Sequence, residues 1–318
     1  MELVKQFIKH RSTFHTPGQE KNVFLFSTPR SGSTWLTEII AAQPGFKMVK
    51  EPFNLRNPVV AEHLGLNSWE DMFSITSRDK IYQYVQSFLK GKDNDLRWKR
   101  PAPFSDLWHL RTDRIIFKIL FSGEDFIGWF QEKFDGQIVY LLRHPIPVSF
   151  SRSKSPRLAS FLQSDFRNNL SDEEYGYGMN ILNNGNDYEK AVLDWTLQNL
   201  MPLRQMRNDW LFISYEQLVL EPEKMVSHMV SKLGFKDPDQ MLSRINKASA
   251  SSHKSAKESQ DVLLDPEQIK NSRRWLVEKW KSKISPENEK RTFEILEAFG
   301  VDHYQYGDFE MNTKYQIH

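Results

Sequence analysis

A short apolar run followed by a loop of small residues is the feature that most constrains this chain. Residues 23–26 (VFLF) predict a buried parallel strand, and residues 27–34 have the sequence STPRSGST. Apolar side chains then recur at helical spacing over residues 35–40, so a helix is expected to follow. At such a junction, the unpaired N–H groups of the first helical turn and the helix dipole favour an anion. The stretch therefore predicts a phosphate-binding loop.

Individual residues of this loop suit an anion in different ways. Gly32 allows a close approach of the backbone, and Arg30 offers a guanidinium that binds oxyanions with two hydrogen bonds. Ser31, Ser33 and Thr34 add hydroxyl donors of little bulk. The first glycine and the lysine of the pattern G-x-x-x-x-G-K-S/T are missing, so this is not a Walker A loop. A serine-rich turn without a ligand is the plainer alternative.

Composition limits the class of protein. The 318 residues are 39% hydrophobic and 26% charged, which suits one large α/β domain spanning residues 1–318. A net charge of +2 argues against a general nucleic-acid or membrane binder but allows a local basic pocket. The absence of cysteine excludes disulfides and thiol nucleophiles, and with nine scattered histidines we expect no metal site. Residues 1–15 contain no long apolar run, so a cytoplasmic protein without signal peptide or membrane span is expected.

Apolar runs alternate with helical patterns along the chain. Further strands are predicted at residues 46–49, 115–120, 138–142 and 210–214. Helices are predicted around residues 77–89, 126–130, 187–206, 221–233 and 286–299, with Ser77 and Asp187 as caps of the first and third. Alternation of this kind predicts a three-layer α/β/α fold with a mostly parallel, P-loop-like central sheet.

Three segments depart from the alternation. Residues 54–113 are rich in aromatic side chains and predict a helical insertion over the active site, where it would build an acceptor pocket. Residues 154–186 contain three glycines and predict a mobile loop, and the polar residues 247–274 predict a flexible lid. Cations that would favour an anionic glycan acceptor, unless they form only a solvated face, are Lys92, Arg97, Lys99 and Arg100.

A second group of polar residues follows the strand at 138–142. Arg143 comes directly after this strand, and Ser151 lies eight residues further on, in the following helix or turn. Ligands of α/β proteins bind at the carboxyl ends of parallel strands, so Arg143 lies where a ligand is expected.

Together these two groups resemble the sulfotransferases that use 3′-phosphoadenosine 5′-phosphosulfate (PAPS). That family has a Pro-Lys/Arg-Ser-Gly-Ser/Thr-Thr loop after its first strand, which residues 29–34 match. It also has an arginine and a serine at the separation of Arg143 and Ser151, which bind the 3′-phosphate. The resemblance runs from about residue 22 to 234. It implies that residues 30–34 bind the 5′-phosphosulfate and that PAPS is the co-substrate.

Two aromatic residues extend the resemblance to the nucleoside. Tyr215 begins a Tyr-Glu-Gln-Leu segment similar to the family's Tyr-Glu-Asp-Leu, in which the tyrosine contacts the adenosine. Trp35 matches the aromatic residue that approaches the adenine in many members, although a helix core residue is an equal alternative.

The catalytic residues implied by the resemblance point to one branch of the family. Animal cytosolic members have Lys-Thr-His after the middle strand and use the histidine as base. Here the aligned residues are Lys118, Ile119 and Leu120, so the lysine is kept and the histidine is lost. Glu51, followed by proline, matches the base of carbohydrate-type and many bacterial members. His144 is an alternative base that we expect to lie too far from the reaction.

The resemblance implies metal-independent, in-line transfer of a sulfuryl group from PAPS to a small-molecule or glycan hydroxyl. Arg30 would stabilise the leaving phosphate, Lys118 would bind the sulfuryl oxygens and Glu51 would take the proton. A P-loop-like small-molecule kinase is one alternative, but it would need a Walker lysine and a magnesium-binding aspartate. A non-catalytic protein that binds adenosine bisphosphate is another, although it would not need these three residues together. Neither the acceptor nor the oligomeric state follows from the sequence.

Overall fold

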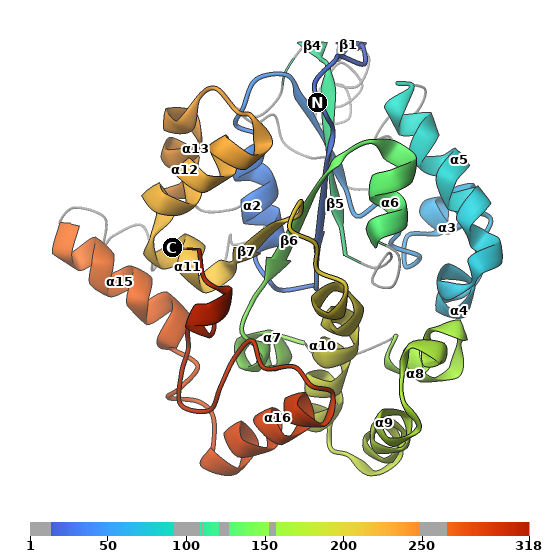
Figure 1. Cartoon of the computed structure of the whole chain (residues 1–318), viewed down its shortest axis with the longest axis vertical. Coiled ribbons are helices and arrows are strands. Elements are labelled where there is room, and N and C mark those ends of the chain that lie inside the picture. Colours follow the sequence, from blue (N-terminus) through green and yellow to red (C-terminus); the bar gives the residue numbers. More distant parts are fainter. Residues whose placement is uncertain are drawn as a thin grey trace, which may run out of the picture.

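Five parallel strands form the central sheet, in the spatial order β3-β5-β2-β6-β7 (Figure 1). The strands are β2 (Val23–Ser27), β3 (Phe46–Lys50), β5 (Arg114–Ile119), β6 (Gln137–Leu142) and β7 (Leu211–Ser214). The computed structural model describes residues 14–91, 109, 111–120, 127–152, 157–247 and 266–317. All five predicted strands are confirmed, and each of them begins and ends within one residue of the predicted position. A separate small parallel sheet pairs β1 (Phe14–His15) with β4 (Arg111–Thr112).

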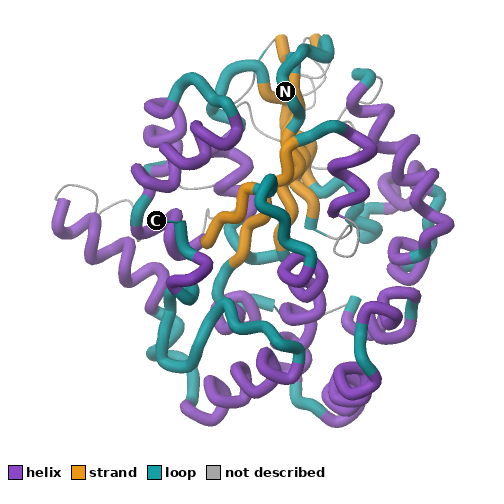
Figure 2. Tube along the Cα trace, in the orientation of Figure 1, coloured by secondary structure: helices purple, strands orange, loops and turns teal. Residues whose placement is uncertain are grey.

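Helices cover both faces of the sheet, which confirms the predicted three-layer fold. α2, α12 and α13 lie on one face, and α5, α6 and α10 pack toward the other (Figure 2). The helices are α2 (Ser33–Ile40), α3 (Pro58–Leu64), α4 (Trp69–Phe73), α5 (Arg78–Leu89), α6 (Ile127–Phe134), α7 (Pro145–Phe150), α8 (Leu158–Gln163), α9 (Asp172–Asn184), α10 (Asp187–Arg204), α11 (Tyr215–Leu220), α12 (Pro222–Leu233), α13 (Pro238–Ile245), α15 (Pro266–Glu278) and α16 (Pro286–Ala298), with 3₁₀ turns η1 (Ile75–Ser77), η3 (Asp165–Asn169) and η4 (Thr313–Tyr315). None of the described helices is long and apolar enough to cross a bilayer.

Burial of the sheet on both faces explains its continuous apolar strands. In β2, Phe24 and Phe26 join the core shared with α5, α6 and α10, whereas Val23 and Leu25 join the core shared with α2 and α12. Phe24 stacks on Phe117 of β5, with ring centroids 5.0 Å apart. Because successive side chains of one strand enter opposite cores, polar and apolar residues do not alternate along it.

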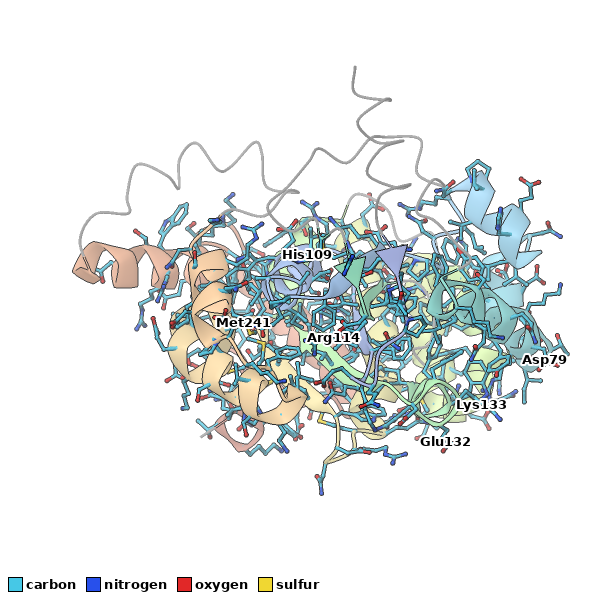
Figure 3. All side chains as sticks on the ribbon, turned by 90° about the horizontal axis from the view of Figure 1, so that it is seen from above. Asp79, His109, Arg114, Glu132, Lys133 and Met241 are labelled. Carbon is cyan, nitrogen blue, oxygen red and sulfur yellow. The ribbon has the colours of Figure 1, made fainter. Side chains whose placement is uncertain are left out.

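An arginine covers the amino-terminal ends of the central strands. Arg114 begins β5 (labelled in Figure 3), and its guanidinium lies over the rings of Phe46 and Phe235, 4.5 and 5.6 Å from the centroids. It also donates to the Pro44 carbonyl at 3.3 Å.

The loop predicted for residues 154–186 is wrong for the part that the structure describes. From residue 157 onward this segment forms α8, η3 and α9, and a reciprocal cap between Ser171 and Glu174 begins α9. Gly176 and Gly178 lie inside α9. A Cβ added to Gly178 would lie 3.1 Å from Leu162 of α8, so this glycine marks close helix packing rather than mobility.

Other expected segments are only partly described. Residues 248–265 of the predicted lid lie outside the described residues, and from Pro266 the chain is helical rather than a loop. The cations at 92–100 also lie outside the described residues. The predicted cap of α10 is wrong, because Asn186 and not Asp187 is its N-cap. Ser77 occupies the N-cap position of α5, as predicted, but forms no side-chain capping bond.

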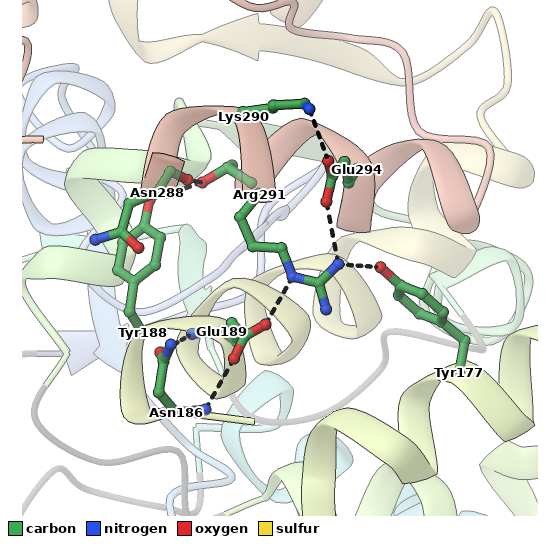
Figure 4. Close-up of polar contacts among 9 residues, drawn as sticks. Tyr177, Asn186, Tyr188, Glu189, Asn288, Lys290, Arg291 and Glu294 are labelled. Atoms are coloured by element: carbon green, nitrogen blue, oxygen red, sulfur yellow. Dashed lines mark hydrogen bonds and ion pairs between the residues drawn. The ribbon is translucent and has the colours of Figure 1, made fainter. Parts of the chain in front are cut away.

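Hydrogen bonds and an ion pair join α16, near the carboxyl terminus, to α10. Arg291 of α16 donates from Nε to Glu189 Oε1 at 2.6 Å and from Nη1 to the hydroxyl of Tyr177 at 2.9 Å (Figure 4). The hydroxyls of Tyr188 and Thr292 bond at 2.7 Å. These bonds join α16 to α10 and to Tyr177 of α9.

Candidate functional site

The predicted site residues lie near the carboxyl ends of the parallel strands. The loop 28–34 follows β2, Glu51 follows β3, Arg143 follows β6 and Tyr215 follows β7, while Lys118 lies next to the end of β5. Open α/β sheets bind their ligands at these ends of the strands. The structure therefore gathers residues that are up to 185 positions apart, from Arg30 to Tyr215, at one edge.

The loop after β2 has an unusual backbone. Arg30 has φ of 72° and Gly32 has φ of 88°, so both occupy the left-handed region. For a non-glycine residue this conformation costs about 1–3 kcal/mol and persists only where the surroundings hold it. The hydroxyls of Thr28 and Ser31 bond across the loop, and Ser31 is fully buried. The Ser31 hydroxyl therefore shapes the loop from inside.

Helix α2 begins without a side-chain cap. Gly32 occupies the capping position and has no side chain to accept from the first N–H groups, although its carbonyl accepts from the Leu36 N–H at 3.1 Å, and the first turn contains no acidic residue. The N–H groups of the first turn have no partner within an α-helix, so they are available to an anion. Ser33 is buried and Thr34 is half-buried at this end of α2.

Close packing against a ring is a second reason for glycine in this loop. A Cβ added to Gly32 would lie 2.6 Å from two ring carbons of Tyr215. Trp35 meets the same ring edge to face at 5.9 Å, and its Nε1 donates to the carbonyl of Ile245 in α13 at 3.3 Å. The two aromatic residues predicted at the nucleoside therefore lie together beside the loop.

Lys118 links three parts of the site. Strand alternation places Lys118 on the same face of the sheet as Ile116, the face that α2 covers. Its Nζ donates to Thr34 Oγ1 at 3.0 Å and lies 2.8 Å from Glu51 Oε1. Only 5% of its side chain is exposed, whereas 24% of the Glu51 side chain is. The ammonium is thus held between the loop and the carboxylate.

Glu51 is also held in a strained conformation. Its φ is 52°, and its N–H donates to the Lys118 carbonyl at 2.8 Å. Asn54 Nδ2 donates to the second carboxylate oxygen at 3.1 Å. Sequence reasoning missed Asn54, for which the only signal is its position three residues after Glu51. Lys118 and Asn54 together orient both oxygens of the carboxylate.

Arg143 contacts the loop and the aromatic pair. Its guanidinium lies over the Tyr215 ring, 4.1 Å from the centroid, and its Nη1 donates to the Arg30 carbonyl at 3.0 Å. Its Nε has no hydrogen-bond partner within the described residues. The carbonyl of Arg143 accepts from Trp195 Nε1 at 3.1 Å. The hydroxyl of Ser151, eight residues on, donates to the Val148 carbonyl at 2.9 Å.

His144 faces the interior rather than the site edge. Its side chain is fully buried, its ring stacks on Trp280 at 4.5 Å, and its Nδ1 accepts from the Ile146 N–H at 3.3 Å. Burial lowers the pKa of His144 from 6.5 to about 3. A neutral ring enclosed in this way cannot collect a proton from a bound acceptor.

A buried carboxylate orders the turn after β6, and sequence reasoning gave it no role. Glu216 Oε1 accepts from the His144 backbone N–H at 3.0 Å. Its Oε2 accepts from the hydroxyls of Tyr304 at 2.8 Å and Ser214 at 3.2 Å. Burial raises the pKa of Glu216, although the bonds from His144 and Tyr304 and the charge of Arg143 oppose that shift. Its signal in the sequence is an acidic residue directly after a strand and Tyr215.

Comparison with protein families identifies one match. Residues 133–306, more than half of the chain, match the family model described as "Sulfotransferase domain". The matched range includes Arg143, Ser151 and Tyr215 and begins after the loop 28–34, Glu51 and Lys118. No curated protein sequence matches the chain.

Solved structures similar to this chain include several sulfotransferases. The sulfotransferase domain of the Synechococcus PCC 7002 olefin synthase is 21% identical over 91% of this chain and 99% of that one, with a TM-score of 0.44. The sulfotransferase domain of the curacin biosynthetic pathway is 18% identical over 89% and 98%, with a TM-score of 0.45. Mouse sulfotransferase SULT7A1 complexed with PAP is 18% identical over 89% and 85%, with a TM-score of 0.44.

Proposed function

This chain belongs to the sulfotransferase domain family, and we propose that it transfers a sulfuryl group from PAPS to a hydroxyl group of a small-molecule or carbohydrate acceptor. In the proposed reaction, the acceptor oxygen bonds to sulfur as the bond from sulfur to the 5′-phosphate oxygen breaks. The hydroxyl proton passes to a base, and adenosine 3′,5′-bisphosphate leaves.

The position of Lys118 carries this proposal. Its ammonium lies 3.0 Å from Thr34 in the candidate phosphate loop and 2.8 Å from the carboxylate of Glu51. A cation between the donor loop and a candidate base is suited to bind the sulfuryl oxygens, on which charge develops during transfer. A sulfuryl oxygen at Lys118 would compete with Glu51 for the same ammonium and so leave the carboxylate available to the acceptor.

Two neighbouring segments would hold the donor. We propose that the N–H groups of residues 32–34 and the Arg30 guanidinium bind the 5′-phosphate. Arg143 and Ser151 would bind the 3′-phosphate, and Trp35 and Tyr215 would contact the adenosine. The contact between Arg143 and the Arg30 carbonyl supports a single ligand reaching both segments.

Glu51 is proposed as the base that takes the acceptor proton. Its two oxygens are oriented by Lys118 and Asn54, so the carboxylate is positioned before the acceptor arrives. With Glu51 as base, the chain would belong with the carbohydrate-type and bacterial members that have a glutamate followed by proline. Transfer would need no metal because protein cations provide the charge, and a chelator should leave turnover unchanged.

The acceptor would enter beside the helical segment 54–113 of a single domain. The described helices of this segment, α3 to α5, pack on the sheet, and the Tyr84 hydroxyl of α5 donates to the Pro52 carbonyl at 2.9 Å. This bond ties the segment to the turn that carries Glu51. We propose that the aromatic and apolar side chains of this segment form one wall of the binding site for a small organic or sugar acceptor.

Two measurements separate the proposal from its competitors. Adenosine 3′,5′-bisphosphate should raise the melting temperature of the protein, whereas ATP with magnesium should not. A kinase would show the reverse. Incubation with sulfur-labelled PAPS and a panel of hydroxyl compounds should then produce an acceptor heavier by one sulfate. Binding of the bisphosphate without transfer to any acceptor would instead favour a non-catalytic binding protein.

A further inference from the structure

Arg152 is a buried arginine next to the predicted donor site. It follows Ser151 directly, and its N–H donates to the Ser149 carbonyl at 3.1 Å. Only 4% of its side chain is exposed. A guanidinium enclosed to this degree is held by protein groups.

The guanidinium of Arg152 joins α10 to the phosphate loop. It forms an ion pair with Asp194 and donates to Gln198 Oε1 at 3.2 Å, both on α10. The same side chain donates from Nη2 to the Pro29 carbonyl at 3.4 Å. The planar fork of arginine can serve several acceptors at once, which a lysine ammonium cannot reproduce with the same geometry.

Two arginines from one segment therefore hold consecutive carbonyls of the loop. Arg152 donates to Pro29 and Arg143 donates to Arg30, whose φ of 72° is strained. The carbonyl of Arg143 is itself held by Trp195, the residue after Asp194. Helix α10 thus supports the loop after β2 and the turn after β6 from adjacent positions.

We propose that Arg152, fixed by Asp194 and Gln198, is a positioning residue of the donor site. It holds the loop in the conformation that presents its N–H groups to the 5′-phosphate, and it does not itself touch the donor. This inference rests on the proposed function, since it assumes that the loop binds the 5′-phosphate of PAPS. Arg143, which is half-buried, contacts the loop and would bind the 3′-phosphate, whereas the Arg152 guanidinium contacts only the loop and α10 among the contacts described above.

The test compares two half-ligands in one variant. Arg152→Lys keeps a cation for Asp194 but cannot serve Gln198 and Pro29 together. Affinity is measured by calorimetry for adenosine 5′-monophosphate, whose phosphate would reach only the loop, and for adenosine 3′-monophosphate, whose phosphate would reach only Arg143 and Ser151. We expect the affinity for the 5′-monophosphate to fall about tenfold, the equivalent of one lost hydrogen bond. The affinity for the 3′-monophosphate should stay within about twofold.

Arg204→Lys is the matched control. Arg204 also pairs with a carboxylate, Glu174, and donates to the carbonyls of Asn169 and Phe299, none of which belongs to the loop. Its replacement should leave both affinities unchanged. In steady-state kinetics, Arg152→Lys should raise the KM for PAPS and leave the KM for the acceptor unchanged.

A second variant guards against misfolding. Arg152→Met combined with Asp194→Leu removes both charges, so no unpaired charge stays buried. Selective loss of 5′-monophosphate affinity in either folded variant supports the inference. Equal loss of both ligands, or no loss, would overturn it while the proposed function stands. If the unaltered protein binds neither monophosphate nor the bisphosphate, the proposed function fails and this inference fails with it.

Discussion

The ammonium of Lys118 and the carboxylate of Glu51 form an ion pair of 2.8 Å between neighbouring strand ends. Lys118 is almost fully buried, and Glu51 keeps its strained backbone through a bond to the Lys118 carbonyl. The two residues therefore depend on each other for position. Their proposed roles differ, however, because one would meet the sulfuryl group and the other the acceptor. Separate substitutions should tell these roles apart.

Glu51→Gln tests the proposed base. The amide keeps the shape of the side chain but cannot accept the proton, so we expect turnover to fall about 10²–10⁴-fold. Affinity for adenosine 3′,5′-bisphosphate should stay nearly unchanged. Steady-state rates and calorimetry provide the two numbers, and Glu62→Gln, at an exposed position of α3, is the control. Undiminished turnover would remove Glu51 from the role.

Lys118→Met tests the proposed contact with the sulfuryl group. Loss of a cation that stabilises developing charge should lower kcat by about 10²–10³-fold. Affinity for the bisphosphate, which has no sulfuryl group, should change much less than affinity for PAPS. Lys133→Met, an exposed lysine of α6, should behave like the unaltered protein. Equal losses for the two nucleotides would contradict the assigned contact.

Gly32→Ala tests the close approach of Tyr215. The variant combines a positive φ with a Cβ 2.6 Å from the Tyr215 ring, so the ring must move. Gly234→Ala is matched, because Gly234 has φ of 67° with nothing within 4 Å of the added Cβ. Both variants should lose about 1 kcal/mol or more of unfolding free energy from the backbone conformation. Only Gly32→Ala should also lose nucleotide affinity, and a loss in both would argue against a local effect.

Acid should destabilise the fold through its buried histidines. The pKa of His144 is lowered from 6.5 to about 3, so the unfolded state binds more protons between these values. Stability should therefore fall as the pH falls below 6.5, by up to about 1.4 kcal/mol per pH unit for this residue. His144→Asn keeps an acceptor for the Ile146 N–H but does not titrate.

The measurement for this prediction is the slope of unfolding free energy against pH between 6.5 and 4. The slope should be shallower in His144→Asn than in the unaltered protein. His15 and His303, each with a pKa lowered to about 4 by burial, act in the same direction in both proteins. Glu216, whose pKa is raised by burial, acts in the opposite direction in both. Identical slopes would show that His144 does not titrate as described.

The sheet was predictable because each strand is buried on both faces and is therefore a short apolar run between polar segments. The loop, Arg143 and Tyr215 were predictable as neighbours because parallel strands bring their carboxyl ends to one edge. Residues 154–186 were misjudged because glycine signals a loop, whereas Gly178 serves the contact between α8 and α9. Short helices such as α11 and α13 contain too few turns for a periodic signal.

The supports of the site could not be read from the sequence. Arg30 and Glu51 adopt positive φ because distant segments hold them, and no local pattern predicts such strain. Arg152, Asp194 and Trp195 act through contacts more than forty residues apart in sequence. Local pattern and family resemblance pointed to residues predicted to touch the donor, but only the fold shows which residues hold them in place.

The central claim is that the loop 28–34 and the turn after β6 hold the two ends of one nucleotide. A crystal structure of the protein soaked with adenosine 3′,5′-bisphosphate tests it most directly. We predict the 5′-phosphate on the N–H groups of residues 32–34 and the 3′-phosphate on Arg143 and Ser151, with the adenosine beside Trp35 and Tyr215. Density for the nucleotide at only one of these segments, or elsewhere on the molecule, would contradict the account.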